Sequence, residues 1–377
     1  MSFEFVSKDS DDRAGITDDV KIKVVGVGGG GGNALNCMVE AGISHIEYIA
    51  VNTDAKALNN SKADTKIQIG TKLTKGRGAG NRPEIGANSA KENGDEIEKV
   101  LKDADMVFIT AGMGGGTGTG AAPVVAQIAQ SLPTDVLVVA VVTKPFDFER
   151  EQKMRQAEAG IEELQKYVDS LIVIPNERLL LGKDKQLTMK QSFELSDDIL
   201  KKGVTSISDL ITMDGFINLD FADICTIMRD AGRAHMAIGH GKGKDKAREA
   251  AEAVITSPLL ETSIEGATRL LINITMSEDI LSQDVDTATK LITESASKDV
   301  EAIFGTAFRS DMKDEMSITV IASRFEDPDK IIQIDNPHLA NFNINTLGNV
   351  SGMTGMPQEQ NADDFDAIFQ ILDSRNK

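Results

Sequence analysis

Short apolar runs alternate with amphipathic stretches over the first half of the 377-residue chain. The apolar runs, each a predicted strand, lie at 21–27, 46–51, 105–111, 135–142 and 170–174. They are almost unbroken, which is typical of parallel strands buried on both faces. Between them, helical periodicity marks 86–102, 119–131 and 151–167. This order predicts a doubly wound α/β domain, a fold that binds ligands at the carboxyl ends of its strands.

A long amphipathic stretch follows at 188–214. Its apolar side consists of Phe193, Leu195, Ile199, Leu200, Val204, Ile207, Leu210 and Ile211, which recur at helical spacing. We expect one long helix here, connecting the first domain to a second α/β unit at 215–325. In that unit the pattern predicts helices at 220–231, 244–255 and 284–297 and strands at 269–275, 302–308 and 317–323.

The two ends of the chain differ in composition from the rest. Residues 1–20 are polar and acidic and predict a flexible arm ahead of the first domain, which spans 21–187. Residues 326–377 are polar and predict a disordered linker and tail. Within the tail, FDAIFQILDSR carries an apolar stripe of Phe365, Ile368, Phe369 and Leu372. The stripe predicts a helix that either binds a partner or docks on its own domain.

Charge and composition narrow the classes of function. The formal net charge of −19 would repel nucleic acid and anionic membranes, so we expect the chain to bind neither directly. Cys37 and Cys225 lie in apolar settings, and no disulfide framework is expected. The first residues lack a signal-peptide pattern, and no apolar run reaches about 18 residues. These features predict a cytoplasmic protein that does not insert into membranes, and no residue cluster predicts a dedicated metal site.

Residues 24–33, VVGVGGGGGN, place a dense run of glycines directly after a predicted strand. Gly26, Gly28 and Gly31 match G-x-G-x-x-G, the pattern that binds dinucleotides in many dehydrogenases. An oxidoreductase that uses a nicotinamide cofactor is therefore one candidate function, although the histidines of the chain mark no obvious acid–base site.

Residues 112–120, GMGGGTGTG, form a second glycine-rich stretch, again between a predicted strand and a predicted helix. Two such stretches can converge on one polyphosphate, because bare backbone N–H groups and helix N-termini bind anions. The hydroxyls of Thr117 and Thr119 add donors. A dehydrogenase would not need this second stretch, and the sequence does not contain the P-loop pattern.

The run GGGTGTG at 114–120 is similar to the phosphate loop of the tubulin/FtsZ family, and the chain resembles the bacterial cell-division GTPases of that family. Further matching motifs, in the same order, are VNTDAKAL (51–58), GAGNRPEIG (78–86), TKPFDFE (143–149), VIPNERLL (173–180) and NLDFADICTIM (218–228). The resemblance covers about residues 20–325. It implies a tubulin/FtsZ-like fold and a GTPase that binds GTP and GDP, with Mg²⁺ held by the nucleotide phosphates rather than by a protein cage.

The resemblance also implies a set of nucleotide-binding residues. Those expected around the phosphates are Gly28, Gly29, Gly30, Gly31, Gly32, Asn33, Gly115, Gly116, Thr117 and Gly118. Asn176 and Asn33 would bind the ribose or the base, and Glu149 matches a glutamate that contacts the ribose in the family.

Phe193 and Asp197 are four residues apart and therefore share one face of the long predicted helix. Phe193 could stack on the base, and Asp197 could accept two hydrogen bonds from the guanine edge. Adenine would present an acceptor there and leave the carboxylate unpaired, at a cost in binding. The alternative is an ordinary core phenylalanine beside a solvated aspartate; the family resemblance favours the nucleotide.

Asp220 and Asp223 lie three residues apart at the start of a predicted helix, where aspartate often serves as a cap. The resemblance implies another role, in which this segment enters the nucleotide pocket of the next subunit and the carboxylates position water or a cation. Hydrolysis would then depend on head-to-tail homopolymers, and such non-closing contacts give open filaments. The family builds these into a cytokinetic ring at mid-cell and tethers them through the C-terminal tail to membrane and regulatory division proteins.

The chain departs from the family pattern at several positions. Arg150 stands where the family usually has glycine, Lys153 where it has arginine, and Arg77 where it has an apolar residue. Lysine keeps the charge but loses the planar fork that binds two phosphate oxygens. We expect GTP to bind, with altered hydrolysis or exchange. A filament protein that binds nucleotide without hydrolysing it remains an alternative, which the intact Asp220 and Asp223 oppose. The tail lacks the proline usual in the family, which leaves its partner open.

Overall fold

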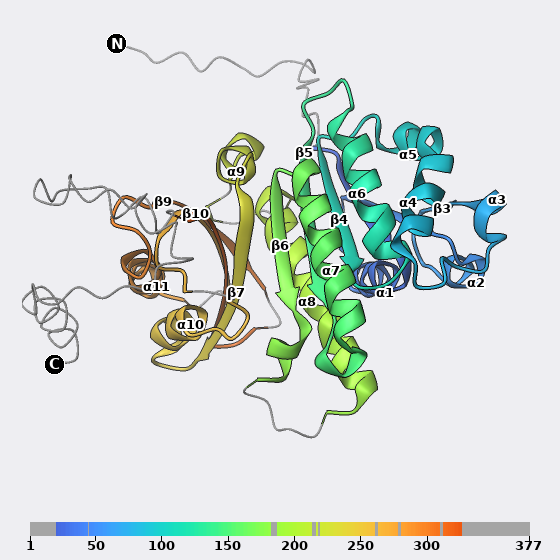
Figure 1. The fold of residues 1–377 in the computed structure, drawn as a ribbon. Helices are drawn as coiled ribbons and strands as arrows, with labels where there is room; N and C mark the ends of the chain where they lie inside the picture. The colour runs from blue at the N-terminus through green and yellow to red at the C-terminus, as the bar shows by residue number, and fades with distance from the viewer. Residues whose placement is uncertain are drawn as a thin grey trace, which may run out of the picture. The chain divides into compact units, whose positions relative to one another are not determined.

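The computed structural model describes residues 20–43, 45–181, 187–212, 216–217, 219–260, 263–277, 280–309 and 312–325. These residues build a ten-stranded sheet in the order β3-β2-β1-β4-β5-β6-β7-β10-β8-β9 (Figure 1). The sheet and its helices confirm the predicted mixed α/β class. Nearly all of the predicted N-terminal arm, and the predicted tail at 326–377, lie outside the described residues.

The first part of the sheet is parallel. Its predicted strands are present as β1 (Ile22–Val27), β2 (Ile46–Asn52), β4 (Met106–Gly112), β5 (Leu137–Lys144) and β6 (Ser170–Pro175). Every residue of β1 is buried, as an unbroken apolar run predicts. The strand β3 (Thr65–Gln68) was not predicted, because its four residues TKIQ are too short and too polar to give a signal.

Helices cover both faces of this parallel part, which confirms the doubly wound arrangement. They are α1 (Gly28–Glu40), α4 (Pro83–Glu92), α5 (Gly94–Leu101), α6 (Thr117–Gln130), α7 (Glu151–Leu164) and α8 (Met189–Thr212), with the short α2 (Ala55–Asn59) and α3 (Thr71–Thr74). The predicted helix 86–102 is two helices broken at Asn93. The side-chain oxygen of Asn93 accepts a hydrogen bond from the Gly70 N–H at 2.9 Å, and Gly94 follows.

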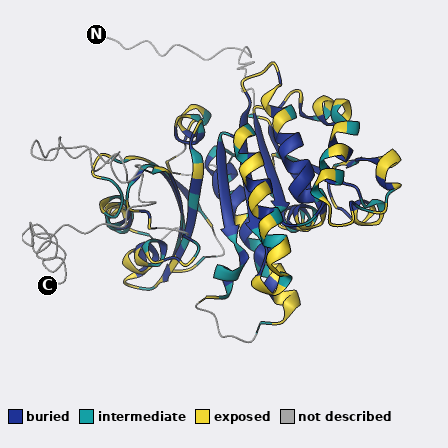
Figure 2. Cartoon of the chain, viewed as in Figure 1, coloured by how far each residue is buried: buried dark blue, intermediate teal, exposed yellow. Residues whose placement is uncertain are grey.

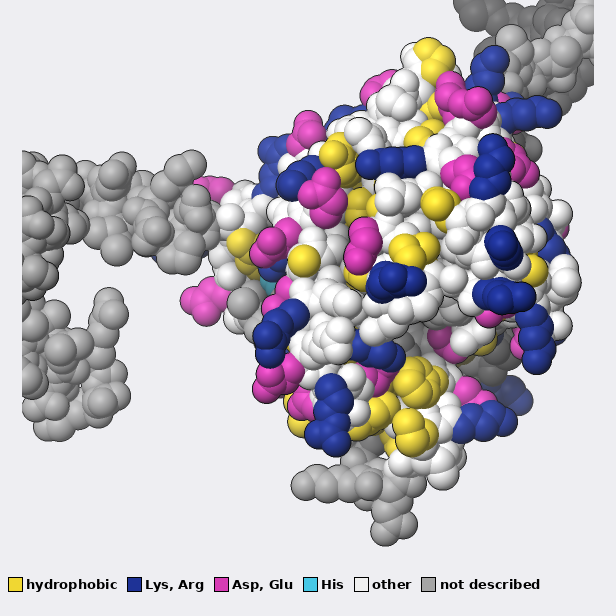
Figure 3. All heavy atoms as spheres, turned by 45° about the vertical axis from the view of Figure 1, so that its right-hand side comes forward, with side chains coloured by type: hydrophobic (Ala, Val, Ile, Leu, Met, Phe, Trp, Pro, Cys, Tyr) yellow, Lys and Arg dark blue, Asp and Glu magenta, His cyan; other side chains and the backbone are white. Residues whose placement is uncertain are grey.

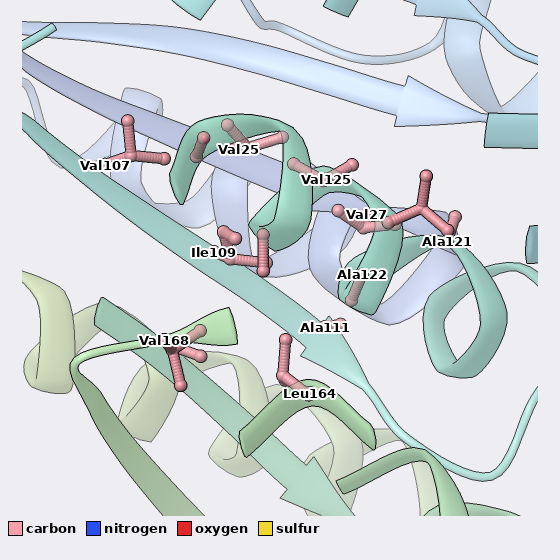
Figure 4. Packing of buried hydrophobic residues seen from close by; sticks show 14 of the residues in the cluster. Val25, Val27, Val107, Ile109, Ala111, Ala121, Ala122, Val125, Leu164 and Val168 are labelled. Carbon is pink, nitrogen blue, oxygen red and sulfur yellow. The ribbon is translucent and has the colours of Figure 1, made fainter. Parts of the chain in front are cut away.

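Alternate residues of β1 belong to different cores. Val25 and Val27 pack with residues of α4, α5, α6 and α7, whereas Ile22 and Val24 pack with residues of α1 and α8. Figure 4 shows the first of these cores around α6 and Leu164 of α7. Figure 2 shows the central parallel strands β1, β4, β5 and β6 buried between their helices, with exposed residues on the outer helix faces. Both faces of the strands are therefore covered, and the strand ends are left for function.

The second part of the chain continues the same sheet. Its elements are α9 (Phe221–Met228), β7 (Gly232–Lys242), α10 (Lys246–Ile255), β8 (Ala267–Met276), α11 (Ser282–Glu294), β9 (Glu301–Phe308) and β10 (Glu315–Phe325). β7 pairs in parallel with β6 and antiparallel with β10, and so joins the two parts. The domain divisions at 187/188 and 214/215 stay predictions.

The sequence pattern missed β7 because it contains glycines. A Cβ on Gly239 would lie 2.0 Å from the carbonyl oxygen of Ala250, and one on Gly241 would lie 2.0 Å from that of Lys246. These glycines let α10 pack directly on the strand. The predicted helix 220–231 accordingly ends at Met228, ahead of β7. No helix among the described residues has the length and hydrophobicity needed to span a bilayer.

Candidate functional site

The two glycine-rich stretches lie side by side at the carboxyl edge of the parallel sheet. β1 and β4 are neighbours, with Val27 opposite Ala111. β1 runs directly into α1, and residues 113–116 connect β4 to α6. Gly28 has a φ of +74°, and a Cβ on it would lie 2.8 Å from the backbone nitrogen of Gly118. The stretches therefore touch each other through backbone atoms, as predicted for loops that converge on one ligand.

Residues 28–32 form the first turns of α1 rather than a loop, which differs from the prediction. Glycine in a helix costs about 0.5–1 kcal/mol relative to alanine, so close contacts must require it. A Cβ on Gly31 would lie 2.2 Å from a carbonyl oxygen of β4, and one on Gly30 would lie 3.2 Å from the backbone of Gly112. The helix packs too closely on β4 for any side chain there.

Other glycines of the site face open space. No atom lies within 4 Å of a Cβ built on Gly29, Gly32 or Gly115. By contrast, a Cβ on Gly116 would lie 2.8 Å from the Arg82 nitrogen and one on Gly118 would lie 2.6 Å from the Gly112 oxygen. The glycine runs thus serve two purposes, close backbone packing and an uncovered surface.

This uncovered surface has free hydrogen-bond donors. The first N–H groups of a helix have no acceptor within the helix. In the described part of the chain, the N–H groups of residues 115–118 donate to no acceptor, whereas the Gly114 N–H donates to Thr119 Oγ1 at 2.8 Å. Thr119 is 3% exposed, and its hydroxyl oxygen binds the backbone of the loop. It therefore does not offer its hydroxyl to a ligand on the surface, contrary to what the sequence suggested. The residues present fit a polyphosphate.

A pocket of about 240 Å³ lies next to these glycines. Its lining includes Gly28, Gly29, Gly32 and Asn33 from the predicted set, together with Asn36, Asn52, Asn60 and Ser61, which the sequence reasoning did not single out. A second pocket, of about 520 Å³, lies between α4, α6 and α7 and contains none of the predicted site residues.

A cluster of aromatic rings lies beside the start of α8. Phe146 is fully buried; its ring stacks on Phe148 with centroids 5.0 Å apart, and it meets Phe193 edge-on at 5.4 Å. Phe193 is 41% exposed and Phe148 is 45% exposed, so each offers a ring edge or face to solvent. Phe148 was not singled out from the sequence, although it lies in the quoted motif TKPFDFE.

Apolar side chains are exposed at several other points as well. Among the described residues, the large exposed ones are Leu73, Phe148, Leu181, Met189, Phe193, Phe216, Ile217 and Leu281. On the face drawn in Figure 3, acidic and basic side chains are interspersed and apolar side chains gather toward its lower end.

Asp197 and Asn176 lie on the same side of the site as Phe193. Asn176 is 4% exposed, and its Oδ1 accepts a hydrogen bond from Ser196 Oγ at 2.8 Å. Burial, with a smaller contribution from Glu194, raises the pKa of Asp197 to about 7. Burial and the nearby Asp197 also raise the pKa of the Cys37 thiol on α1, one turn after Asn33. Asp197 therefore faces α1 in a poorly solvated position, rather than bulk water.

Two of the departures from the family, Arg150 and Lys153, lie immediately before α7 and in its first turn. Lys153 Nζ lies 2.8 Å from Glu149 Oε2, and Glu149 Oε1 accepts a hydrogen bond from the Phe146 N–H at 3.2 Å. Arg150, between them, has φ 80° and ψ 158°. This backbone region is essentially restricted to glycine and costs about 1–3 kcal/mol for other residues.

Asp220 and Asp223 are not brought to the glycines. Both are exposed at the start of α9, and Asp220 makes no side-chain capping hydrogen bond. The end of α9 is fixed at the amino end of β6, where Ser170 Oγ donates to the Met228 carbonyl at 2.6 Å. In Figure 1 the arrows of β4 and β6 point away from α9. The two aspartates thus lie at the sheet edge opposite the glycine loops.

Comparison with known proteins agrees with this architecture. Residues 21–181 match the GTPase domain of the Tubulin/FtsZ family, and residues 232–326 match the C-terminal domain of the FtsZ family. An empty FtsZ dimer from M. jannaschii is 39% identical, with a TM-score of 0.77 over 81% of this chain and 88% of that one. A point mutant of that FtsZ gives 39% identity and a TM-score of 0.78 over 81% of this chain and 92% of that one.

A more distant structure shares the fold alone. The GTPγS-bound protofilament of CetZ2 from Haloferax volcanii is 19% identical, with a TM-score of 0.67 over 83% of this chain and 96% of that one. The family matches and the 39% identity to FtsZ favour a GTPase over the nicotinamide-dependent oxidoreductase, which the first glycine run alone had allowed. This chain belongs to the tubulin/FtsZ family of GTPases.

Proposed function

We propose that this protein polymerises head to tail and hydrolyses GTP at the contact between copies, with Asp220 and Asp223 of one copy completing the nucleotide site of the next. The observation that carries the proposal is the separation described above. The glycine loops lie at the carboxyl edge of the sheet and the aspartates at its amino edge. The related FtsZ forms a dimer and CetZ2 a protofilament, which supports self-association.

The phosphates of GTP would bind on the open surface over Gly29, Gly32 and Gly115. The N–H groups of residues 115–118, at the N-terminus of α6, have no acceptor in the described part of the chain, and a helix N-terminus favours anions. Thr117 at the first position of α6 adds a hydroxyl donor. The loop makes no covalent step; it orients the phosphates and neutralises charge as the terminal phosphoryl group leaves.

The guanine would lie against Phe193, with Asp197 accepting from its N–H groups and Asn176 and Asn33 contacting base or ribose. The exposed ring of Phe193 and the buried carboxyl of Asp197 support this arrangement. Glu149 would reach the ribose only after giving up part of its ion pair with Lys153. We infer that this pair slows exchange or hydrolysis relative to a chain with arginine at that position.

Asp220 and Asp223 would position the attacking water in the shared site. Mg²⁺ would enter with the nucleotide, because this ion is usually bound through substrate phosphates and one or two carboxylates rather than by a cage of protein side chains. When bound, the ion neutralises charge on the phosphates. The carboxylates of the second copy orient water toward the terminal phosphorus and accept its proton.

At the level of the cell, we infer that the filaments build a cytokinetic ring at mid-cell and that the tail at 326–377 binds tethering and regulatory proteins. The family supports this inference. The tail lies outside the described residues, and its partner stays a prediction.

The test uses two variants that damage opposite halves of the shared site. Asp220→Ala removes a carboxylate, and Gly115→Glu places a negative charge in open space where the phosphates would sit. Phosphate release is measured from GTP over a range of protein concentrations, with ATP as the control nucleotide. We expect a concentration threshold for the unchanged protein with GTP, and no release from either variant alone.

Mixing the variants decides the point. Copies with Asp220→Ala keep an intact pocket, and copies with Gly115→Glu keep intact aspartates, so a mixed filament contains complete sites. Restored GTP hydrolysis in the mixture supports a shared site. Hydrolysis that is linear in protein from the lowest concentration, or a mixture as inactive as its parts, would contradict the proposal.

A further inference from the structure

Thr53 is a fully buried polar residue in the loop after β2, with no role so far. Its side chain is 0% exposed, and its Oγ1 lies 2.6 Å from the Oγ1 of Thr117, the first residue of α6. The two residues are 64 positions apart in the chain. A hydroxyl pair at this distance is a short hydrogen bond, in which either oxygen can be the donor.

The backbone of Thr53 ties a third segment to the same point. Its carbonyl oxygen accepts a hydrogen bond from the Gly78 N–H at 3.2 Å. Thr74 Oγ1 lies 3.3 Å from the same oxygen and 3.0 Å from the Gly70 carbonyl, and it can donate its one proton to either. The next residues continue this contact, with the Ala55 N–H donating to the Gly76 carbonyl at 3.1 Å. Thr53 thus joins the loop that carries Arg77 to the phosphate loop.

When an anion binds, counting donors and acceptors determines which of the two hydroxyls donates to the other. A threonine hydroxyl has one proton to donate, and phosphate oxygens in the ionised nucleotide only accept. If Thr117 donates its one proton to a phosphate, then Thr53 must be the donor in the hydrogen bond between the two hydroxyls. The Thr53 proton then polarises the Thr117 hydroxyl and strengthens the bond to the phosphate.

We propose that Thr53 is a positioning residue for nucleotide binding, which acts through Thr117 by donating to its hydroxyl and aiming its proton at the phosphates. This inference rests on the proposed phosphate role of Thr117. It adds that the Thr117 hydroxyl acts together with that of Thr53. It also adds that Thr53 connects the loop at 74–78 to the phosphate loop.

The substitution Thr53→Val removes the hydroxyl and keeps the shape. We expect GDP to bind the full-length variant about three- to tenfold more weakly, the fold-change of one hydrogen bond lost to a buried partner. Affinity is measured by calorimetric titration, and the melting temperature without nucleotide is recorded alongside. Thr110→Val is the matched control, because the Thr110 hydroxyl is also fully buried and has no partner in the described structure. Its GDP affinity should equal that of the unchanged protein.

A double-mutant cycle separates positioning from a general structural role. Thr117→Val alone should weaken GDP binding, and adding Thr53→Val to it should have no further effect, because Thr53 acts only through Thr117. An equal loss from Thr53→Val in both backgrounds, or no loss in the original background, would overturn the inference. If Thr117→Val itself leaves GDP affinity unchanged, the proposed phosphate site is wrong and the inference falls with it.

A second pair of variants covers the case in which Thr53→Val does not fold. Thr53→Ser and Thr53→Ala both lack the methyl group and differ from each other mainly by the hydroxyl. We expect Thr53→Ser to bind GDP as the unchanged protein does and Thr53→Ala to show the threefold to tenfold loss. Equal affinities for this pair would overturn the inference.

Discussion

Two surfaces of the candidate site are built in opposite ways. The glycine surface, residues 28–32 and 112–118, offers backbone atoms, and positions that need a positive φ or a close contact there are occupied by glycine. The aromatic surface, made of Phe146, Phe148 and Phe193 with Asn176 and Asp197, offers side chains. Beside it, Arg150 holds a backbone conformation that suits glycine.

The difference shows where this sequence has freedom to change. On the glycine surface the packing of α1 on β4 leaves no volume for a side chain at Gly30 or Gly31, so these two positions are fixed by sterics. On the aromatic surface Asp197 is titratable, and the neighbouring Arg150 holds a strained backbone; neither lies in the strands of the sheet. We therefore expect changes at these packed glycines to affect folding first, and changes at the aromatic surface to affect binding and its dependence on conditions.

The largest effect is expected for Gly31→Ala. The new Cβ would lie 2.2 Å from a carbonyl oxygen of β4, so α1 must move off the strand. We expect a loss of about 3 kcal/mol or more in the free energy of unfolding, at the upper end of overpacking costs. Denaturant unfolding followed by circular dichroism measures it.

Gly32→Ala is the matched control in the same helix. Nothing lies within 4 Å of its added Cβ, and alanine is the better helix former by about 0.5–1 kcal/mol. Its stability should equal or exceed that of the unchanged protein, while GDP affinity falls because the methyl covers the open surface. Equal destabilisation by both substitutions would show that close packing does not distinguish the two glycines.

The next effect is a dependence of GDP affinity on pH, which only the aromatic surface should show. It arises from Asp197, because burial raises the pKa of this carboxyl to about 7. A carboxylate can accept hydrogen bonds from two guanine N–H groups, whereas a protonated carboxyl presents an O–H donor in place of one acceptor. GDP affinity should therefore fall as pH drops below 7, by at most about tenfold per unit. The nucleotide-free protein should behave in the opposite sense. Its stabilisation by protonated Asp197 is complete below about pH 4, the ordinary value, and is lost as pH rises through 7.

Asp197→Asn provides the comparison for this prediction. It removes the titrating group, so GDP affinity measured from pH 6 to about 8.5 should be weaker and should lack the step near 7. Titration of the nucleotide phosphates is common to both proteins and cancels in the ratio of their affinities. A ratio that stays constant with pH would mean that the carboxyl of Asp197 does not face the base.

The sequence predicted the parallel strands because their apolar runs are buried on both faces, and it predicted α8 from its long apolar stripe. It could not reveal β7, whose glycines accommodate α10, or the helical state of residues 28–32, which depends on contact with β4. Thr53 was missed for a related reason. Its partner Thr117 is 64 residues away, and a buried hydroxyl leaves no periodic signal.

The smallest effect is expected at Arg150, beside the aromatic surface. Replacing it with glycine gives this backbone position the residue that its conformation suits. Arg150→Gly relieves strain of about 1–3 kcal/mol but adds freedom to the unfolded chain worth about 0.4–1 kcal/mol. We expect a net gain of about 1 kcal/mol in the free energy of unfolding. Arg155→Gly, the same change in the interior of α7, should instead cost about 1 kcal/mol. Opposite signs for the two arginines would locate the strain in the backbone of residue 150. If both changes destabilise the protein equally, the φ of 80° at Arg150 costs no measurable free energy of folding. The backbone of residue 150 would then be no more strained than that of the glycines at 28–32.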